Sequence, residues 1–204
     1  MKTRYIVITL TAICTSCIGH ADEIAADAFA EMSAQRTKTF DVATSKLKGS
    51  TSFRISYPKS WSTTDSARPR VVTRIASANG EGMDSLVIVV GQSNLKSKNP
   101  TPDSVFTKEF FSKFELPGST VVRSERVKEG TFDGAVIEYF VDQSRPPMRM
   151  RVFVTNYVFT QRGALVQLQF YVLLGEKEDK KSDDARIIAF KPLWKAMLAT
   201  LKLE

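Results

Sequence analysis

The sequence is almost without histidine and cysteine. Its 204 residues contain one histidine and two cysteines, and His20, Cys14 and Cys17 all lie within the first twenty positions. A Ser-His-Asp triad or a Cys-His pair needs residues that the rest of the chain does not have. Typical zinc and copper sites are excluded there for the same reason. Disulfides are excluded too, so the folded part must be stabilised by the burial of apolar surface.

Glycine and proline are also sparse. The 10 glycines and 8 prolines, beside 13 phenylalanines, exclude collagen-like and disordered classes. With 43% hydrophobic and 25% charged residues, the composition is that of an ordinary globular protein. The length suits one domain with a sizeable core.

The first 21 residues have the order of charges and apolar residues that is typical of a secretion signal. Lys2 and Arg4 are positive, residues 5–19 carry no charge, and small residues stand at positions 19 and 21. This pattern predicts cleavage before Asp22. A transmembrane anchor is the alternative, but the uncharged run is shorter than the roughly 20 residues that span a bilayer.

A lipoprotein signal is a second alternative, because Cys17 follows two small polar residues. Lipidation sites usually have leucine three positions before the cysteine, where this chain has Cys14, so cleavage after Ala21 is favoured. We therefore expect a periplasmic or secreted protein.

The chain is basic, with a formal net charge of +7 that falls to +5 without Lys2 and Arg4. Basic and acidic residues alternate in the runs 123–129 and 176–181. Such mixed runs are usually solvated faces or loops. We expect no nucleic-acid partner, and a charge that serves solubility or an acidic partner.

After the leader, residues 22–51 are predicted to form an N-terminal helix and linker, and residues 52–204 the globular domain. The alanine-rich stretch from Asp22 to Lys38 has Ile24, Phe29 and Met32 near one helical face. The polar stretch from Phe40 to Ser52 is interpreted as a connector.

The first half of the domain has strand-like patterns followed by a helix. Phe53, Ile55 and Tyr57 alternate with polar residues up to Pro58, and two more predicted strands cover Val71 to Ser77 and Leu86 to Val90. Asn79 to Gly82 is the predicted hairpin between these two strands. A helix is predicted from Pro102, with Phe106, Phe110 and Phe114 on one face and Asp103 as its N-cap.

Four further β segments with short separators predict an antiparallel meander: Thr120–Lys128, Ala135–Asp142, Met148–Thr160 and Ala164–Leu174. A closing helix is predicted from the spacing of Leu193, Trp194, Met197, Leu198 and Leu201, with Pro192 near its first turn or at a kink. The sum is an α+β domain, an antiparallel β-sheet of about six to seven strands with helices packed on its faces.

The run from Phe53 to Trp61, FRISYPKSW, resembles the opening of the PsbP and DcrB-like superfamily. In that superfamily a strand ending in Tyr-Pro, followed by Trp, begins a curved antiparallel sheet between helices. The resemblance covers Ser52 to Leu203 and implies a sandwich fold whose known members are mostly non-enzymatic binding, assembly or chaperone modules. It carries over no catalytic residue. From the residues alone, Tyr57 and Trp61 are expected to serve the core and its rim.

The sequence indicates no catalytic, cofactor-binding or metal site. The acids between Glu176 and Asp184 alternate with lysines and lack EF-hand spacing. Glu138 and Asp142 share one side of a predicted strand, but an exposed pair of acids is the common outcome.

The candidate contact surface is a predicted hairpin. Arg145, Arg149 and Arg151 flank Pro146-Pro147, and arginine forks bind carboxylates and phosphates. The alternative is that these arginines pair with acids of the next strand, such as Glu138.

Two functions from different classes fit these observations. The first is an exported, non-enzymatic binding or assembly protein of the cell envelope that acts through a protein partner, with immunity or chaperone-like roles included. The second is a periplasmic carrier of a small apolar ligand or lipid in a pocket between sheet and helix. A carrier needs a large apolar cavity, whereas a protein-binding module needs a filled core.

Overall fold

The structure is a computed structural model that describes residues 23–42, 51–68, 70–77, 84–92, 101–112, 118–145, 148–174 and 180–204. The predicted leader at 1–21 and the predicted turn at 79–82 lie outside these ranges. After a helix at residues 23–33, the elements are β1 (Thr37–Asp41), β2 (Phe53–Pro58), β3 (Ser62–Thr64), β4 (Val71–Ala76), β5 (Ser85–Gln92), α2 (Pro102–Val105), α3 (Lys108–Ser112), β6 (Ser119–Glu129), β7 (Phe132–Arg145), β8 (Met148–Gln161), β9 (Ala164–Leu173), α4 (Lys180–Ala199) and β10 (Lys202–Leu203).

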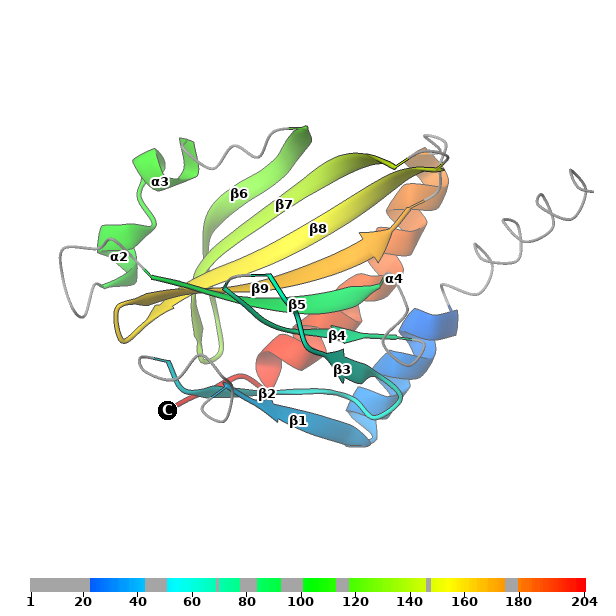
Figure 1. Ribbon diagram of the computed structural model, residues 1–204, viewed down its shortest axis with the longest axis horizontal. Helices are drawn as coiled ribbons and strands as arrows, with labels where there is room; N and C mark the ends of the chain where they lie inside the picture. The colour runs from blue at the N-terminus through cyan, green and yellow to red at the C-terminus, as the bar shows by residue number, and fades with distance from the viewer. Residues whose placement is uncertain are drawn as a thin grey trace, which may run out of the picture.

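The larger sheet has seven strands in the order β3-β4-β5-β9-β8-β7-β6, and all neighbours are antiparallel. The predicted meander is confirmed, because β6, β7, β8 and β9 follow one another in both sequence and sheet order (Figure 1). Along β9 every second residue is buried, which is the pattern of a strand with one core face. The α+β class is the one predicted, and the seven strands of this sheet agree with the expected six to seven.

The strand at Phe53–Pro58 belongs to a second, three-stranded sheet with the order β1-β2-β10. The sequence predicts neither β1 nor β10. In the register of this sheet, Phe40 lies opposite Ile55 and Leu203 lies opposite Phe53. Because Phe53, Ile55 and Tyr57 all point into the core, the polar side of β2 is left as an outer face.

The N-terminal segment is part of the packed unit. Ala25, Ala28 and Met32 of the first helix are buried in the main core, and Glu31 accepts hydrogen bonds of 2.9 Å from the backbone N–H and hydroxyl of Ser60. The packed unit therefore begins before the predicted boundary at Ser52. The predicted connector from Phe40 also begins inside β1.

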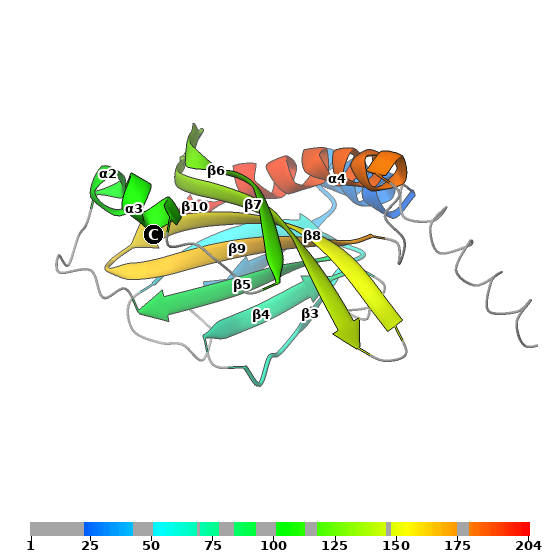
Figure 2. The same cartoon turned by 90° about the horizontal axis from the view of Figure 1, so that it is seen from above.

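The main core lies between α4 and one face of the large sheet (Figure 2). Trp194 of α4 packs against the rings of Phe153 and Phe170 in the sheet and against Phe190 of its own helix. The helix begins at Lys180, so Pro192 lies inside it rather than in its first turn. The large rings at the helix–sheet contact explain why the closing helix docks as its spacing predicts.

On the opposite face a second cluster is formed by Val105 and Phe106 with residues of β7 and β8. The helix predicted from Pro102 is broken there into α2 and α3. The hydroxyl of Thr107 accepts a 3.3 Å hydrogen bond from the Phe110 N–H and so caps a new helix start. Asp103 lies in the first turn of α2 and is not its N-cap, which is Thr101.

Gly134 of β7 provides a test of the sheet packing. A Cβ atom there would lie 2.8 Å from Cζ of Phe132 and closer still to the carbonyl oxygen of Val158. Replacing Gly134 with Ala is expected to lower the free energy of unfolding by about 1–3 kcal/mol, measured by urea denaturation. Gly91→Ala is the matched control, because its nearest neighbour, the Leu165 carbonyl oxygen, is 3.8 Å away. Equal stability of the two variants would contradict the close approach of Phe132 and Val158 to Gly134.

Candidate functional site

The predicted contact surface lies at the β7–β8 hairpin. Arg145 ends β7, Arg149 pairs with Ser144 across the hairpin, and Arg151 pairs with Asp142. The structure describes the backbone of these strands but not the side chains of residues 143–149. The three arginines are therefore placed together by the hairpin, and only the side chain of Arg151 can be described.

Arg151 is turned toward helix α4. Its guanidinium lies 3.3 Å from the Asp183 carboxylate, 3.8 Å from the Asp142 carboxylate and 4.4 Å from the centre of the Phe140 ring. Asp183 is buried in the first turn of α4, where a helix N-terminus also favours a carboxylate. Arg151 thus connects the hairpin to α4, and its partners are Asp142 and Asp183 rather than Glu138.

The structure separates the two acids that share one side of β7. Asp142 is largely exposed, whereas Glu138 is buried beside α4 and accepts a 3.4 Å hydrogen bond from the Thr155 hydroxyl. The Lys191 ammonium lies 3.4 Å from the same carboxylate oxygen of Glu138. These contacts are those of an ion pair that helps to dock the helix.

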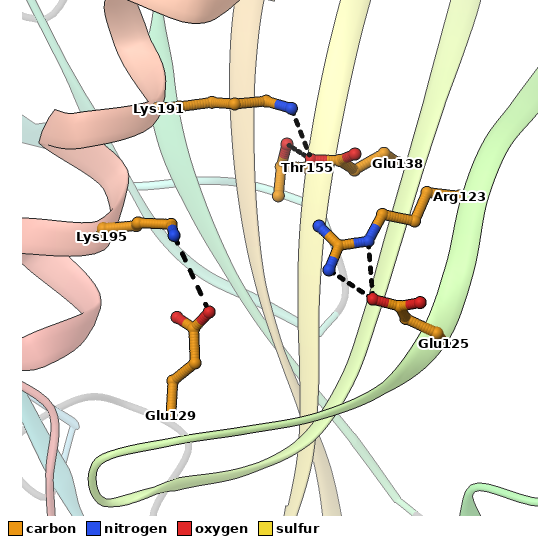
Figure 3. A network of polar contacts seen from close by, with 7 residues as sticks. All are labelled: Arg123, Glu125, Glu129, Glu138, Thr155, Lys191 and Lys195. Atoms are coloured by element: carbon orange, nitrogen blue, oxygen red, sulfur yellow. Dashed lines mark hydrogen bonds and ion pairs between the residues drawn. The ribbon is translucent and has the colours of Figure 1, made fainter.

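A wider polar network continues from Glu138 between α4 and strand β6 (Figure 3). Lys195 of α4 reaches to 3.9 Å from the Glu129 carboxylate, and Arg123 donates to Glu125 within β6. The side chains of the Arg123–Glu125 and Lys195–Glu129 pairs are substantially exposed, so each of these two pairs contributes about 0–1 kcal/mol. The Lys191–Glu138 and Lys195–Glu129 pairs join α4 to strands β7 and β6.

Tyr157 lies close to this network and is buried. Burial raises the pKa of its hydroxyl to about 12, with smaller contributions from Glu129 and Glu138. Burial also raises the pKa of Tyr139 and Tyr171 on the other face of the sheet. Since these phenols are neutral when folded, none of them has the low pKa of a general base at neutral pH.

The raised pKa of Tyr157 predicts an alkaline loss of stability. An unfolded tyrosine ionises near pH 10, so the neutral folded form stabilises the protein fully below pH 10, and this contribution is lost as the pH rises toward 12. The loss is expected to be about 1.4 kcal/mol for each pH unit in this window. Denaturation of the wild type and Tyr157→Phe at several pH values measures it, because the variant should have the shallower slope. Identical slopes for the wild type and Tyr157→Phe would contradict the raised pKa of Tyr157.

Another polar contact of α4 is one that the sequence does not reveal. Nη2 of Arg186 donates to both carboxylate oxygens of Asp84, at 3.1 and 3.0 Å, and the Leu173 N–H donates to Oδ1 of Asp84 at 3.1 Å. Both charged side chains are largely buried. Asp84 and Arg186 are 102 positions apart, so no local pattern pairs them.

In the described ranges, no group of three or more acids, histidines or cysteines is close enough together to hold a metal ion. None of the helices that the structure describes is long and apolar enough to cross a membrane. The run of acids and lysines between Glu176 and Asp184 lies partly outside the described residues.

No family model matches the chain, and no curated protein sequence matches it. Among solved structures, the Ran-binding protein Mog1p of Saccharomyces cerevisiae is 13% identical with a TM-score of 0.47, over 82% of this chain and 95% of Mog1p. LpqN of Mycobacterium tuberculosis, which is involved in cell envelope biogenesis, is 14% identical with a TM-score of 0.43, over 84% of this chain and 94% of LpqN. A Bacteroides thetaiotaomicron protein is 12% identical with a TM-score of 0.42, over 83% of this chain.

The chain spans about half the length of the Bacteroides protein, with 49% of that protein covered. The alignments with Mog1p and LpqN extend over most of both chains. Because the identities are 12–14% and the TM-scores are below 0.5, the similarity carries no inference about activity or partner. Membership of the PsbP and DcrB-like superfamily stays a prediction.

Proposed function

We propose that the chain is an exported, non-enzymatic protein of the cell envelope that acts by binding a protein partner. The observation that carries this proposal is the filled space between α4 and the large sheet. The rings of Phe190, Phe153 and Phe170 surround Trp194 in this space, each with its centroid 5.8–6.5 Å from that of Trp194, and all four residues are at most 3% exposed. A carrier would need this volume for its ligand.

The polar side chains support a binding role over a catalytic one. Two buried acids, Asp84 just before β5 and Glu138 in β7, have partners on α4 that hold the helix in place. The buried tyrosines have raised pKa values. Catalytic groups are usually poised near the working pH and face a common cleft.

The proposal is tested by affinity capture of the tagged protein from envelope extract after brief cross-linking, with protein and small-molecule eluates both analysed by mass spectrometry. We expect one protein at near-stoichiometric yield, and a loss of that protein with the double variant Arg145→Gln and Arg149→Gln. Lys108→Gln, an exposed change on α3, is the matched control. A co-eluting lipid without any protein would support the carrier instead.

Export is tested separately by the mass of the protein recovered from cells. The order of residues in the leader predicts that the recovered chain begins at Asp22. Replacing Ala21 with Arg is expected to block this cleavage and leave a protein about 2 kDa heavier, since 21 residues would stay attached. A recovered chain that begins at Cys17 and carries lipid would overturn the predicted cleavage site.

A further inference from the structure

Strand β6 is one edge of the seven-stranded sheet. It runs for 11 residues and pairs with β7, and in the part of the chain that the structure describes no strand pairs with its other side. Figure 1 shows β6 as the outermost strand along the upper edge of the sheet. Alternate residues of an antiparallel strand direct their N–H and C=O groups away from the neighbouring strand. A long edge of this kind is a template on which another strand can pair.

A β-bulge limits the regular part of this edge. The register between β6 and β7 shifts between Val121 and Arg123, so the ladder is regular from Arg123 to Glu129. Val121 and Val122, at the bulge, are 43% and 58% exposed. A second strand therefore has the stretch from Arg123 onward to pair with, and it would cover exposed apolar surface beside the bulge.

A second copy of β6 fits this stretch in one register. Two copies related by a two-fold axis pair antiparallel, and the alternation of the hydrogen-bonding groups requires the axis to pass through a residue that faces itself. An axis at a charged residue places like charges opposite each other, which destabilises a sheet. This excludes Arg123, Glu125, Arg126, Lys128 and Glu129 as the centre. An axis at Val127 places Glu125 opposite Glu129, so Ser124 alone remains as the centre.

The register centred on Ser124 is complementary in charge. Arg123 of each copy lies opposite Glu125 of the other, and both positions are on the face of the sheet that α4 covers. Arg126 lies opposite Val122, so no like charges meet. Opposite charges at directly facing positions stabilise an antiparallel pair.

The existing pair of Arg123 and Glu125 leaves room for this contact. Nε of Arg123 donates to Oε1 of Glu125 at 2.9 Å, and Nη2 of Arg123 donates to the same oxygen. The other oxygen of Glu125, Oε2, points away from Arg123 (Figure 3). Oε2 can accept from the guanidinium of the second copy, so that four charges alternate in sign around the axis.

We propose that the chain forms a two-fold dimer through antiparallel pairing of β6 with β6 of a second copy, centred on Ser124. A single pair of short strands is a small interface, so the dimer is weak and forms at high protein concentration. The inference goes beyond the proposed binding of another protein and does not depend on it.

Disulfide trapping tests the register, because Ser124 faces its own copy across the axis. Opposite Cα atoms of an antiparallel pair are about 4.5–5.5 Å apart, which is within the range that a disulfide spans. Ser124→Cys is made in the full chain with Cys14→Ser and Cys17→Ser, which then has no other thiol. We expect mild oxidation to link this variant into a covalent dimer, measured on a non-reducing gel.

Thr120→Cys in the same background is the matched control, because the two copies of residue 120 would be roughly 26 Å apart along the paired strands. Ser124→Cys is expected to form the covalent dimer at least about tenfold faster than Thr120→Cys. Equal rates for the two variants would overturn the register.

Charge exchange tests the interface in solution. Sedimentation equilibrium of the chain with Cys14→Ser and Cys17→Ser, from about 5 to about 500 µM, is expected to show monomer and dimer in equilibrium. Arg123→Glu and Glu125→Arg, each alone, place like charges opposite each other and should weaken the dimer by about tenfold or more. The double variant restores opposite charges and should dimerise as the unchanged strand does.

Lys59→Glu, an exposed change in the turn after β2, alters the net charge as Arg123→Glu does and should leave the dimer unchanged. A thermal melt of each variant verifies that it is folded. A monomer at every concentration would overturn the proposal. A dimer that neither single charge variant weakens would have its interface elsewhere and would overturn it equally.

Discussion

Replacing Asp84 with Ala is expected to lower the free energy of unfolding by about 3–5 kcal/mol. The change leaves the Arg186 guanidinium in a largely buried position without its carboxylate, and it also removes the acceptor of the Leu173 N–H. A buried charge without a partner is far more costly than the pair was favourable. Urea denaturation followed by circular dichroism measures the loss, with the slope of the transition showing whether unfolding stays two-state.

A double-mutant cycle separates the ion pair from simple packing. Arg186→Met alone should also destabilise the protein, since it leaves the Asp84 carboxylate buried with one hydrogen bond from Leu173. Asp84→Leu alone should destabilise the protein as Asp84→Ala does, and combining it with Arg186→Met should recover most of the loss, because two apolar side chains avoid the desolvation of two charges. Additive losses in the double variant would mean that the two side chains do not act as a pair.

The strands and the closing helix could be predicted because their apolar residues have a clear period. The face of β9 repeats at every second residue, and Trp194, Met197 and Leu198 repeat at helical spacing. Strand β1 has only Phe40 as an apolar residue and β10 has two residues, so neither has a detectable alternation. Their strand conformation is imposed by pairing with β2.

The contacts of the candidate sites could not be predicted for a related reason. The sequence placed Arg151 on a hairpin, but its orientation depends on Asp183, which a separate element brings close. Likewise, Asp84 meets Arg186 only once α4 has packed against the large sheet. Local periodicity determines elements, whereas side-chain partners that are many positions apart depend on how those elements pack.

Replacing Trp194 with Ala is expected to cost about 3–5 kcal/mol, because it removes a large ring from a core that has no room to collapse. Its indole lies 5.8 Å from the Phe170 ring, 6.1 Å from the Phe190 ring and 6.5 Å from the Phe153 ring, measured between centroids. These contacts join α4 to β8 and β9, so the variant should lose stability across the whole domain. Thermal and urea denaturation measure the loss.

Two variants on the same helix make this prediction specific. Ile188→Ala removes an apolar side chain that is 66% exposed, so it should change stability by less than about 0.5 kcal/mol. Trp194→Phe keeps a ring in the cluster and should lose less than Trp194→Ala, although a cavity is left on one side. An unchanged melting curve for Trp194→Ala would remove α4 from the core. The space beneath the helix would then be open to a ligand, and the carrier would be favoured over the protein-binding module.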